Sequence, residues 1–230
     1  MSVEKLINQS FGFSFNVKEY FLSVMQNIWD AVRSWARDWL KRVLDVVVAL
    51  VGLVLVAPLF LVIAVAIKLD SRGSIFYRQE RVGQGGRVFM IHKFRTMHQE
   101  SEVATGPVWA KRGDSRVSRI GAYLRRFHLD ELPQLVNVLW GEMSLVGPRP
   151  ERPAIVGQLA MVVDHYEHRL AVKPGITGLA QTRYRYDQTI ADVRRKIRYD
   201  LLYIRNMCLG LDLRILLRTV TVVFAGRGMH

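Results

Sequence analysis

Residues 125–150 read RRFHLDELPQLVNVLWGEMSLVGPRP, and the rest of the chain is organised around them. An acid pair, Asp130 and Glu131, is followed by apolar residues at helical spacing. Asp130 is a favourable N-cap, and Pro133 is tolerated in a first helical turn because its missing N–H needs no partner there. The spacing therefore predicts a helix that begins at the acid pair and ends near Gly141. The free amides and partial positive charge of such a helix start favour an anion.

Arginines stand on both sides of this acid pair. Arg125 and Arg126 precede it, and Arg149 follows it between two prolines. Nearby arginines keep a carboxylate ionised and help to hold a diphosphate, and an arginine fixed between prolines loses little freedom on binding phosphate. An ionised Asp130 can act as nucleophile or metal ligand. The alternative, which spacing alone leaves open, is that Asp130 only caps the helix, Glu131 is a first-turn charge and the arginines are solvated.

An uncharged apolar run covers residues 46–67 and is long enough to cross a bilayer as a helix. Pro58 lies near its middle, where it removes a helix hydrogen bond and can bend the axis. Basic residues flank both ends of the run, and such flanks prefer the cytosolic side. The pattern favours a re-entrant helix broken at Pro58 over a helix that spans the membrane. The basic flanks are Arg33, Arg37, Lys41 and Arg42 before the run, and Lys68, Arg72, Arg78 and Arg81 after it.

Two further segments have the pattern of amphipathic interfacial helices. In residues 17–40, apolar residues that include three tryptophans recur at three- and four-residue steps beside basic side chains, which suits the head-group boundary of a bilayer. A core helix or an oligomer contact, such as a homodimer, is the alternative. Residues 209–224 are strongly apolar, with Arg214 and Arg218 one turn apart, and suit either a membrane surface or a buried core.

A β-hairpin is predicted directly after the apolar run. Residues 74–77 and 87–91 have strand composition and surround the glycine-rich stretch RVGQGG. That stretch is neither a P-loop nor a dinucleotide fingerprint, because the lysine and the strand-to-helix context of those motifs are missing. Lys93 and Arg95 are two residues apart and share a face of the extended chain, where they could contact phosphate or be solvated. Residues 174–178, PGITG, are expected to form a tight turn.

Composition limits the partners. The chain of 230 residues is half apolar, enough for one catalytic domain with attached membrane elements. A net charge of +13 calls for nucleic acid, anionic lipid or a phosphorylated substrate. No nucleic-acid-binding motif appears and the basic residues are scattered, so we expect no nucleic acid partner, although a membrane-anchored nucleic-acid-binding or regulatory protein is the alternative function. The single cysteine excludes an intramolecular disulfide.

Three motifs in this order resemble one known family. Residues 125–150, together with KFRTM at 93–97 and PGITG at 174–178, resemble the bacterial sugar transferases, the monotopic phosphoglycosyl transferases. The resemblance runs from about Lys41 to the C-terminus. It implies a mostly helical α/β fold with a small β-hairpin or sheet, held at the bacterial inner membrane with its catalytic domain in the cytosol. The expected parts are an N-terminal extension (1–40), a re-entrant helix (41–69) and a catalytic domain (70–230).

The resemblance also implies a reaction: transfer of sugar-1-phosphate from a UDP-sugar to polyprenyl phosphate, such as undecaprenyl phosphate, with release of UMP. This is a first membrane step in the assembly of exopolysaccharide, capsule, O-antigen or other glycoconjugates. Asp130 would be the nucleophile, and Glu131 with Asp130 would hold Mg²⁺. Substrate contacts are implied for Lys93, Arg95, Arg125, Arg149, Gly175, Thr177, Gln181 and Arg183.

The chain departs from the family pattern at two places. Many members have Ser-Pro at the helix break, where this chain has Ala57-Pro58. Many have a Gln-Val-Asn-Gly-Arg run, where this chain has QTRYR at residues 181–185. Lys41, Arg42 and Asp45, by contrast, resemble a motif that anchors the membrane helix of the family to its catalytic domain. The alternative for the two basic residues is that their side chains extend to the membrane interface.

Overall fold

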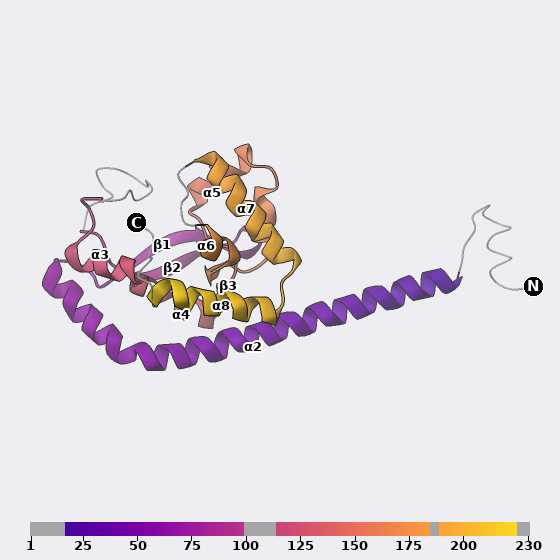
Figure 1. The fold of residues 1–230 in the computed structure, drawn as a ribbon, viewed down its shortest axis with the longest axis horizontal. Coiled ribbons are helices and arrows are strands. Elements are labelled where there is room, and N and C mark those ends of the chain that lie inside the picture. The colour runs from indigo at the N-terminus through magenta and orange to yellow at the C-terminus, as the bar shows by residue number, and fades with distance from the viewer. Residues whose placement is uncertain (1–16, 99–113, 185–188, 225–230) are drawn as a thin grey trace, which may run out of the picture. The chain divides into compact units, whose positions relative to one another are not determined.

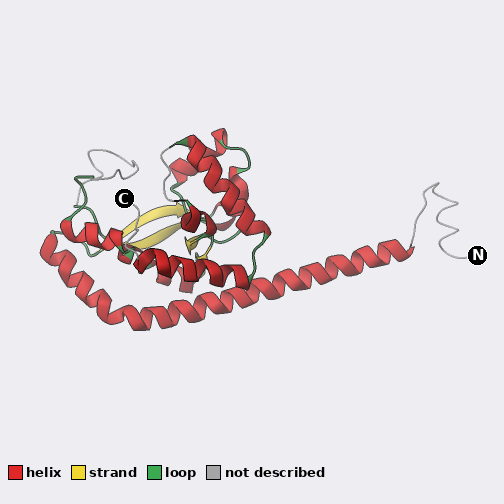
Figure 2. Ribbon diagram, in the orientation of Figure 1, coloured by secondary structure: helices red, strands yellow, loops and turns green. Residues whose placement is uncertain are grey.

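The structure is a computed structural model that describes residues 17–98, 114–184 and 189–224 (Figure 1). The chain divides into two units, Met1–Lys41 and Arg42–His230. The described part is mostly helical with two small sheets, as Figure 2 shows, so the prediction of a mostly helical chain with little sheet is confirmed. The second small sheet was not expected.

One long helix, α2 (Val17–Asp70), contains both the amphipathic stretch and the apolar run. It stays helical through Pro58, where a break was predicted, and its ribbon bends in its second half (Figure 1). A proline removes one hydrogen bond but need not end a helix whose other residues favour it. Among the described residues, α2 is the helix long and apolar enough to cross a membrane by length and composition. Many of its apolar side chains are exposed, with Leu55 at 74%.

The hairpin forms as predicted but extends further along the chain. β1 (Phe76–Val82) pairs antiparallel with β2 (Val88–Phe94), with Phe76 opposite Phe94 and Val82 opposite Val88. The connecting turn, η1 (Gln84–Gly86), places Gly85 and Gly86 at φ values of 65° and 79°, which favour glycine. Phe89 and Ile91 of β2 are buried on one face of the hairpin.

A second sheet pairs β3 (Ser144–Val146) with β4 (Gly175–Thr177) in parallel. The tight turn expected at residues 174–178 is therefore wrong, because this stretch is extended and its backbone bonds to β3 and the residues after it. A Cβ on Gly175 would lie 2.1 Å from the backbone nitrogen of Gly147, so the close approach of the two chains requires glycine.

Short helices and 3₁₀ turns complete the Arg42–His230 unit. In chain order they are α3 (Arg119–Arg126), η2 (Leu129–Glu131), α4 (Gln134–Trp140), α5 (Pro153–Val162), η3 (Tyr166–Ala171), α6 (Leu179–Arg183), α7 (Ile190–Arg205) and α8 (Leu209–Phe224). The largest core cluster joins α2, β2, α4, β3, α7 and α8 through Ala49, Ile91, Val138, Tyr203 and Ile215, among others. This packing fixes β2, α4 and β3 relative to one another, and the acid pair lies among them.

The helix α2 is tied to the rest of this unit by two polar side chains. Arg42 donates hydrogen bonds to the carbonyls of Val138 (2.6 Å) and Leu139 (2.8 Å) at the C-terminus of α4. Asp45, which is buried, accepts a hydrogen bond from the backbone nitrogen of Leu145 (3.0 Å). The anchoring role that the family resemblance implies for Arg42 and Asp45 is thus confirmed.

Candidate active site

The acid pair lies in a 3₁₀ turn and not at the start of an α-helix. His128, at φ 54°, adopts the left-handed conformation after α3, and η2 follows with Asp130 and Glu131 inside it. The N-cap of α4 is Pro133, which makes no side-chain capping bond. The predicted capping role of Asp130 is therefore wrong, because the left-handed turn at His128 starts a separate turn before α4. Asp130 and Glu131 are buried, with exposures of 8% and 7%. Because no α-helix starts at them, the positive charge around them comes from neighbouring side chains.

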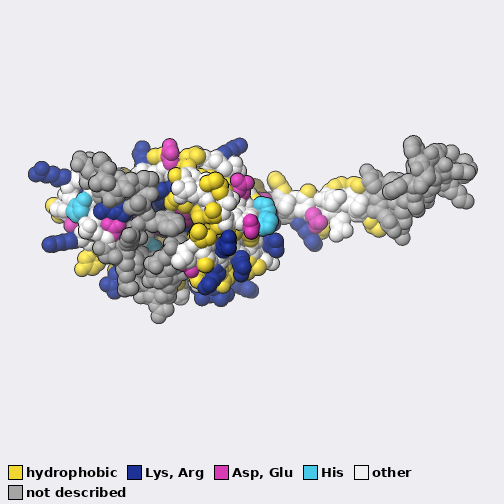
Figure 3. All heavy atoms as spheres, turned by 90° about the horizontal axis from the view of Figure 1, so that it is seen from above, with side chains coloured by type: hydrophobic (Ala, Val, Ile, Leu, Met, Phe, Trp, Pro, Cys, Tyr) yellow, Lys and Arg dark blue, Asp and Glu magenta, His cyan; other side chains and the backbone are white. Residues whose placement is uncertain are grey.

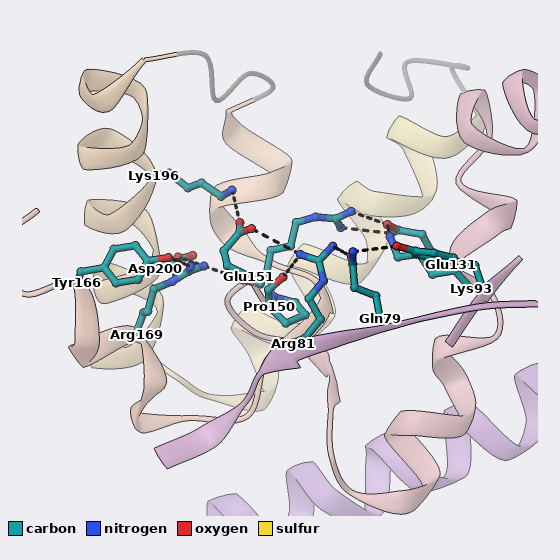
Figure 4. A network of polar contacts seen from close by, with 12 residues as sticks. Gln79, Arg81, Lys93, Glu131, Pro150, Glu151, Tyr166, Arg169, Lys196 and Asp200 are labelled. Atoms are coloured by element: carbon teal, nitrogen blue, oxygen red, sulfur yellow. Dashed lines mark hydrogen bonds and ion pairs between the residues drawn. The ribbon is translucent and has the colours of Figure 1, made fainter. Parts of the chain in front are cut away.

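Glu131 binds two cations. Lys93 Nζ, from β2, donates to Glu131 Oε1 (2.7 Å), and Arg149 Nη2, from the loop after β3, donates to the same oxygen (2.5 Å), as Figure 4 shows. Arg149 Nη1 reaches Glu131 Oε2 (3.3 Å). Burial alone would raise the pKa of Glu131, but the charges and hydrogen bonds of Arg149 and Lys93 lower it well below its usual value. Glu131 is therefore ionised at neutral pH.

Asp130 is placed differently, although it is the adjacent residue. Among the described residues it forms no ion pair, and its pKa is raised. The main cause is burial; the charge of Lys93 opposes it, and the negative charge of Glu131 adds to it. Nearby cations were predicted to keep both acids ionised. In the structure, Arg149 and Lys93 lower the pKa of Glu131, whereas burial raises the pKa of Asp130.

Of the other arginines expected at the site, the structure brings one close and places the other elsewhere. Arg125, in the last turn of α3, donates to Thr96 Oγ1 (2.8 Å), and its charge acts on Asp130. Arg95 is buried and donates to the carbonyls of Arg72 (2.6 Å) and Ser71 (2.8 Å). The structure thus directs the Arg95 side chain to the residues after α2 and the Lys93 side chain to Glu131, and contact of Arg95 with a substrate stays a prediction.

The four residues expected to contact the nucleotide lie in and after β4. Gly175 packs against the backbone that leads to Arg149, and Thr177 Oγ1 lies 2.7 Å from Thr219 Oγ1 of α8. Gln181 donates to the carbonyl of Ile176 (3.1 Å), and Arg183 is exposed at the end of α6. Their contact with a nucleotide stays a prediction. Arg185 and Tyr186, which could serve the same purpose, lie outside the described residues.

Sequence reasoning missed a polar network on the other side of Arg149. It joins β1, the loop after β3, η3 and α7 through Gln79, Arg81, Glu151, Tyr166, Arg169, Lys196 and Asp200 (Figure 4). One signal for it was present in the sequence. Asp200 falls at helical spacing from Val193, Ile197 and Tyr203, which form the buried face of α7. A carboxylate on an apolar helix face needs a buried partner, and Arg169 is that partner.

The acid pair has the donor chemistry that suits Mg²⁺. Its carboxylate oxygens are hard ligands, and Mg²⁺ usually binds one or two carboxylates and completes its shell with water and substrate phosphates. Among the described residues no group of three or more His, Cys, Asp or Glu side chains could hold a metal ion by itself. Asp130 and Glu131 therefore fit a magnesium ion that arrives with a phosphate substrate.

The sequence matches the bacterial sugar transferase family over residues 36–226. The chain belongs to this family. It is 48% identical over 189 residues to a UDP-glucose:undecaprenyl-phosphate glucose-1-phosphate transferase of Caulobacter vibrioides, covering 80% of this chain and 70% of that protein. It is 44% identical over 190 residues to a UDP-N-acetylgalactosamine-undecaprenyl-phosphate N-acetylgalactosaminephosphotransferase of Aeromonas hydrophila, covering 83% of this chain and 45% of that protein.

A third bacterial sugar transferase relative matches almost the whole chain. A UDP-glucose:undecaprenyl-phosphate glucose-1-phosphate transferase of Escherichia coli is 37% identical over 227 residues, covering 95% of this chain and 48% of that protein. The chain thus spans about half the length of the Aeromonas and Escherichia proteins. Because the named relatives use two different sugars, the family match leaves the sugar open.

Proposed function

We propose that this bacterial sugar transferase moves sugar-1-phosphate from a UDP-sugar to undecaprenyl phosphate or a similar polyprenyl phosphate. The observation that carries the proposal is the buried acid pair, in which Glu131 binds Lys93 and Arg149 while Asp130 has no ion pair among the described residues. The names of the relatives support the two substrates. The exposed apolar surface of α2 supports an acceptor that is itself lipid.

Transfer takes place by two displacements at one phosphorus atom. A carboxylate oxygen of Asp130 attacks the phosphorus that bears the sugar, and a new O–P bond forms. The bond from that phosphorus to the bridging oxygen of the diphosphate breaks, and UMP leaves with the electron pair. The sugar phosphate is then an acyl phosphate on Asp130.

The acceptor completes the reaction. A phosphate oxygen of the polyprenyl phosphate attacks the same phosphorus, the bond to Asp130 breaks, and the carboxylate is restored. The product is polyprenyl-diphosphate sugar. Lys93 and Arg149, which are already held at the acid pair, orient the phosphates and offset their charge.

Magnesium fits this proposal as a bound ion held by Glu131 and Asp130 with the substrate phosphates. When bound it would neutralise phosphate charge and stabilise the departing UMP. Chelation with EDTA should stop UMP release, and added Mg²⁺ should restore it. Full activity in EDTA would contradict this part of the proposal.

The membrane disposition is a separate proposal. The basic residues on both flanks of the apolar run favour a re-entrant α2 with both ends in the cytosol. A cysteine at position 2 (Ser2→Cys) should stay unlabelled when a membrane-impermeant thiol reagent is added outside intact cells. The native Cys208, which is exposed, serves as the control for cytosolic thiols. Labelling at position 2 alone would indicate a spanning helix.

The central test is UMP release from a panel of UDP-sugars, with and without polyprenyl phosphate. Radiolabelled donor alone should label the protein, and this label should be absent in Asp130→Asn. If Asp130→Asn keeps substantial transfer while Glu131→Gln loses it, the assignment of Asp130 as the nucleophile is wrong. If no UDP-sugar is turned over, the proposed activity is wrong.

A further inference from the structure

The loop that carries Arg149 is held by its backbone carbonyls. Each of the four consecutive carbonyls of residues 148–151 accepts a hydrogen bond. The donors are, in order, Gly175 N (2.9 Å), Arg169 Nη2 (2.8 Å), Arg81 Nη1 (3.0 Å) and Val82 N (2.9 Å). Two of the four residues are prolines, which have no N–H. The hydrogen bonds to the carbonyls are therefore an important part of what holds the backbone of this segment. Two of these donors are backbone groups, and two are arginine side chains.

The donor to Arg149 itself is the most constrained of these arginines. Arg169 is only 4% exposed, and all three of its side-chain nitrogens have partners. Two of them, Nε and Nη2, lie within 3.0 Å of Asp200 Oδ2, with Nη2 at 2.9 Å. Its Nε donates to Asp200 Oδ2 (3.0 Å), its Nη1 donates to Tyr166 Oη (3.0 Å), and its Nη2 donates to the carbonyl of Arg149. A planar guanidinium held at three points has one orientation. Figure 4 shows Arg169 and Asp200 on one side of the loop, and Glu131 with Lys93 on the other.

Stability alone gives a weak reason for this buried ion pair. Removing two charges from water is costly, and well-packed apolar residues in their place are often equally stable or more so. An apolar pair could not donate a hydrogen bond to the Arg149 carbonyl. The hydrogen bond to the Arg149 carbonyl explains why a guanidinium is needed here, and Asp200 orients that guanidinium.

We propose that Arg169, oriented by Asp200 of α7, is a positioning residue that sets where the Arg149 guanidinium meets Glu131 and the substrate phosphates. The inference rests on the function proposed above. Asp200 touches neither the acid pair nor, on this account, the substrate, and it acts through Arg169 and the backbone of Arg149. Without the Asp200 carboxylate, the site should still form, but the Arg149 guanidinium should be less well positioned. A misplacement of about 1 Å at a reacting group can cost about 100-fold in rate.

A double-mutant cycle separates positioning from general support of the fold. The rate of covalent labelling by radiolabelled UDP-sugar is measured for the wild type, Asp200→Asn, Arg149→Ala and the double variant. We expect Asp200→Asn to slow labelling roughly 10- to 100-fold when Arg149 is present. In the Arg149→Ala background the same change should slow it by no more than about twofold, because its target is gone. Equal slowing in both backgrounds overturns the inference.

Asp45→Asn is the matched control, because Asp45 is also a buried carboxylate but its bond is to Leu145. Its effect should be the same in both backgrounds. If Asp200→Asn does not fold, Tyr166→Phe takes its place in the cycle, since it removes a single bond to Arg169 and keeps the ion pair. If none of the UDP-sugars labels the wild-type protein, the proposed covalent mechanism is wrong. If the wild type is labelled but Asp200→Asn has the same effect with and without Arg149, only the positioning role is wrong.

Discussion

Replacing Glu131 by glutamine should destabilise the protein even though the side chain keeps its shape. The wild-type carboxylate accepts hydrogen bonds from Lys93 Nζ (2.7 Å) and from Arg149 Nη2 (2.5 Å) and Nη1 (3.3 Å). Glutamine has one carbonyl oxygen for these donors, and its amide group would face a cation. The substitution therefore leaves two cationic side chains near the acid pair without the charge that compensates them.

The size of the effect follows from burial. Removing one partner of a fully buried ion pair costs about 3–5 kcal/mol. The side chains of Lys93 and Arg149 are 16% and 31% exposed, so water offsets part of the loss, and the remaining carbonyl oxygen keeps one bond. We therefore expect a loss of about 2–3 kcal/mol. For a domain of this size, each kcal/mol lowers the Tm by roughly 2–4 °C, which gives a decrease of roughly 4–12 °C.

The effect should depend on pH with a defined sign. The pKa of Glu131 is lowered well below its usual value, so its stabilisation is fully present above the unfolded pKa of about 4.3 and is lost as the pH falls through the folded pKa. The difference in Tm between wild type and Glu131→Gln should be largest near neutral pH. It should narrow as the pH falls below about 4.

The assay is thermal unfolding of detergent-solubilised protein at several pH values. Glu80→Gln provides the control, because it makes the same change in net charge at an exposed position of β1 and should change stability by no more than about 0.5 kcal/mol. If Glu131→Gln unfolds at the wild-type temperature at pH 7, the two cations do not depend on Glu131 in the way described.

Four further substitutions test other parts of the structure. Asp130→Asn should abolish covalent labelling yet raise the Tm near neutral pH: the folded pKa of Asp130 is raised, so its ionisation destabilises the fold as pH rises, and the neutral amide avoids this. Arg42→Ala should lower stability by about 2–4 kcal/mol in thermal unfolding, since two charged hydrogen bonds to the C-terminus of α4 are lost; an unchanged Tm would mean that α2 is anchored otherwise. Gly121→Ala should destabilise by about 1–3 kcal/mol because its Cβ would lie 2.0 Å from the Thr96 carbonyl, whereas Gly157→Ala, with open space around it, should stabilise α5 by about 0.5–1 kcal/mol.

The sequence predicted the elements whose residues have a regular apolar pattern or a glycine turn. The apolar run, the hairpin around the glycine turn and helix α8 have a pattern that the sequence displays directly. The pairing of β3 with β4 could not be found in this way, because strands of three residues have no readable period and their partners are distant in sequence. The glycines of PGITG are typical of a turn, but in the structure Gly175 allows two extended backbones to approach each other.

The candidate site was predicted in its residue types more accurately than in its contacts. Lys93 and Arg149, which were both expected to contact substrate, meet at Glu131. The side chain of Arg95 bonds to the carbonyls of Ser71 and Arg72, a contact between two segments that strand alternation cannot show. The Arg169–Asp200 pair joins residues that are 31 positions apart, and no short motif encodes such a contact.

The two adjacent acids differ in their environments because the surrounding cations are shared unequally. A carboxylate that accepts hydrogen bonds from two cations has most of its lone pairs engaged and its pKa lowered, and both make it a weaker nucleophile. Glu131 is in that position, and it holds Lys93 and Arg149 at the acid pair. Asp130, one residue away, keeps its oxygens out of ion pairs within the described part of the chain and has a raised pKa, so it is the more basic of the two. Pairs of titratable groups whose pKa values are pushed apart are typical of sites that divide roles in this way. The 3₁₀ turn makes the division possible, because it presents both side chains from the same short segment to different neighbours.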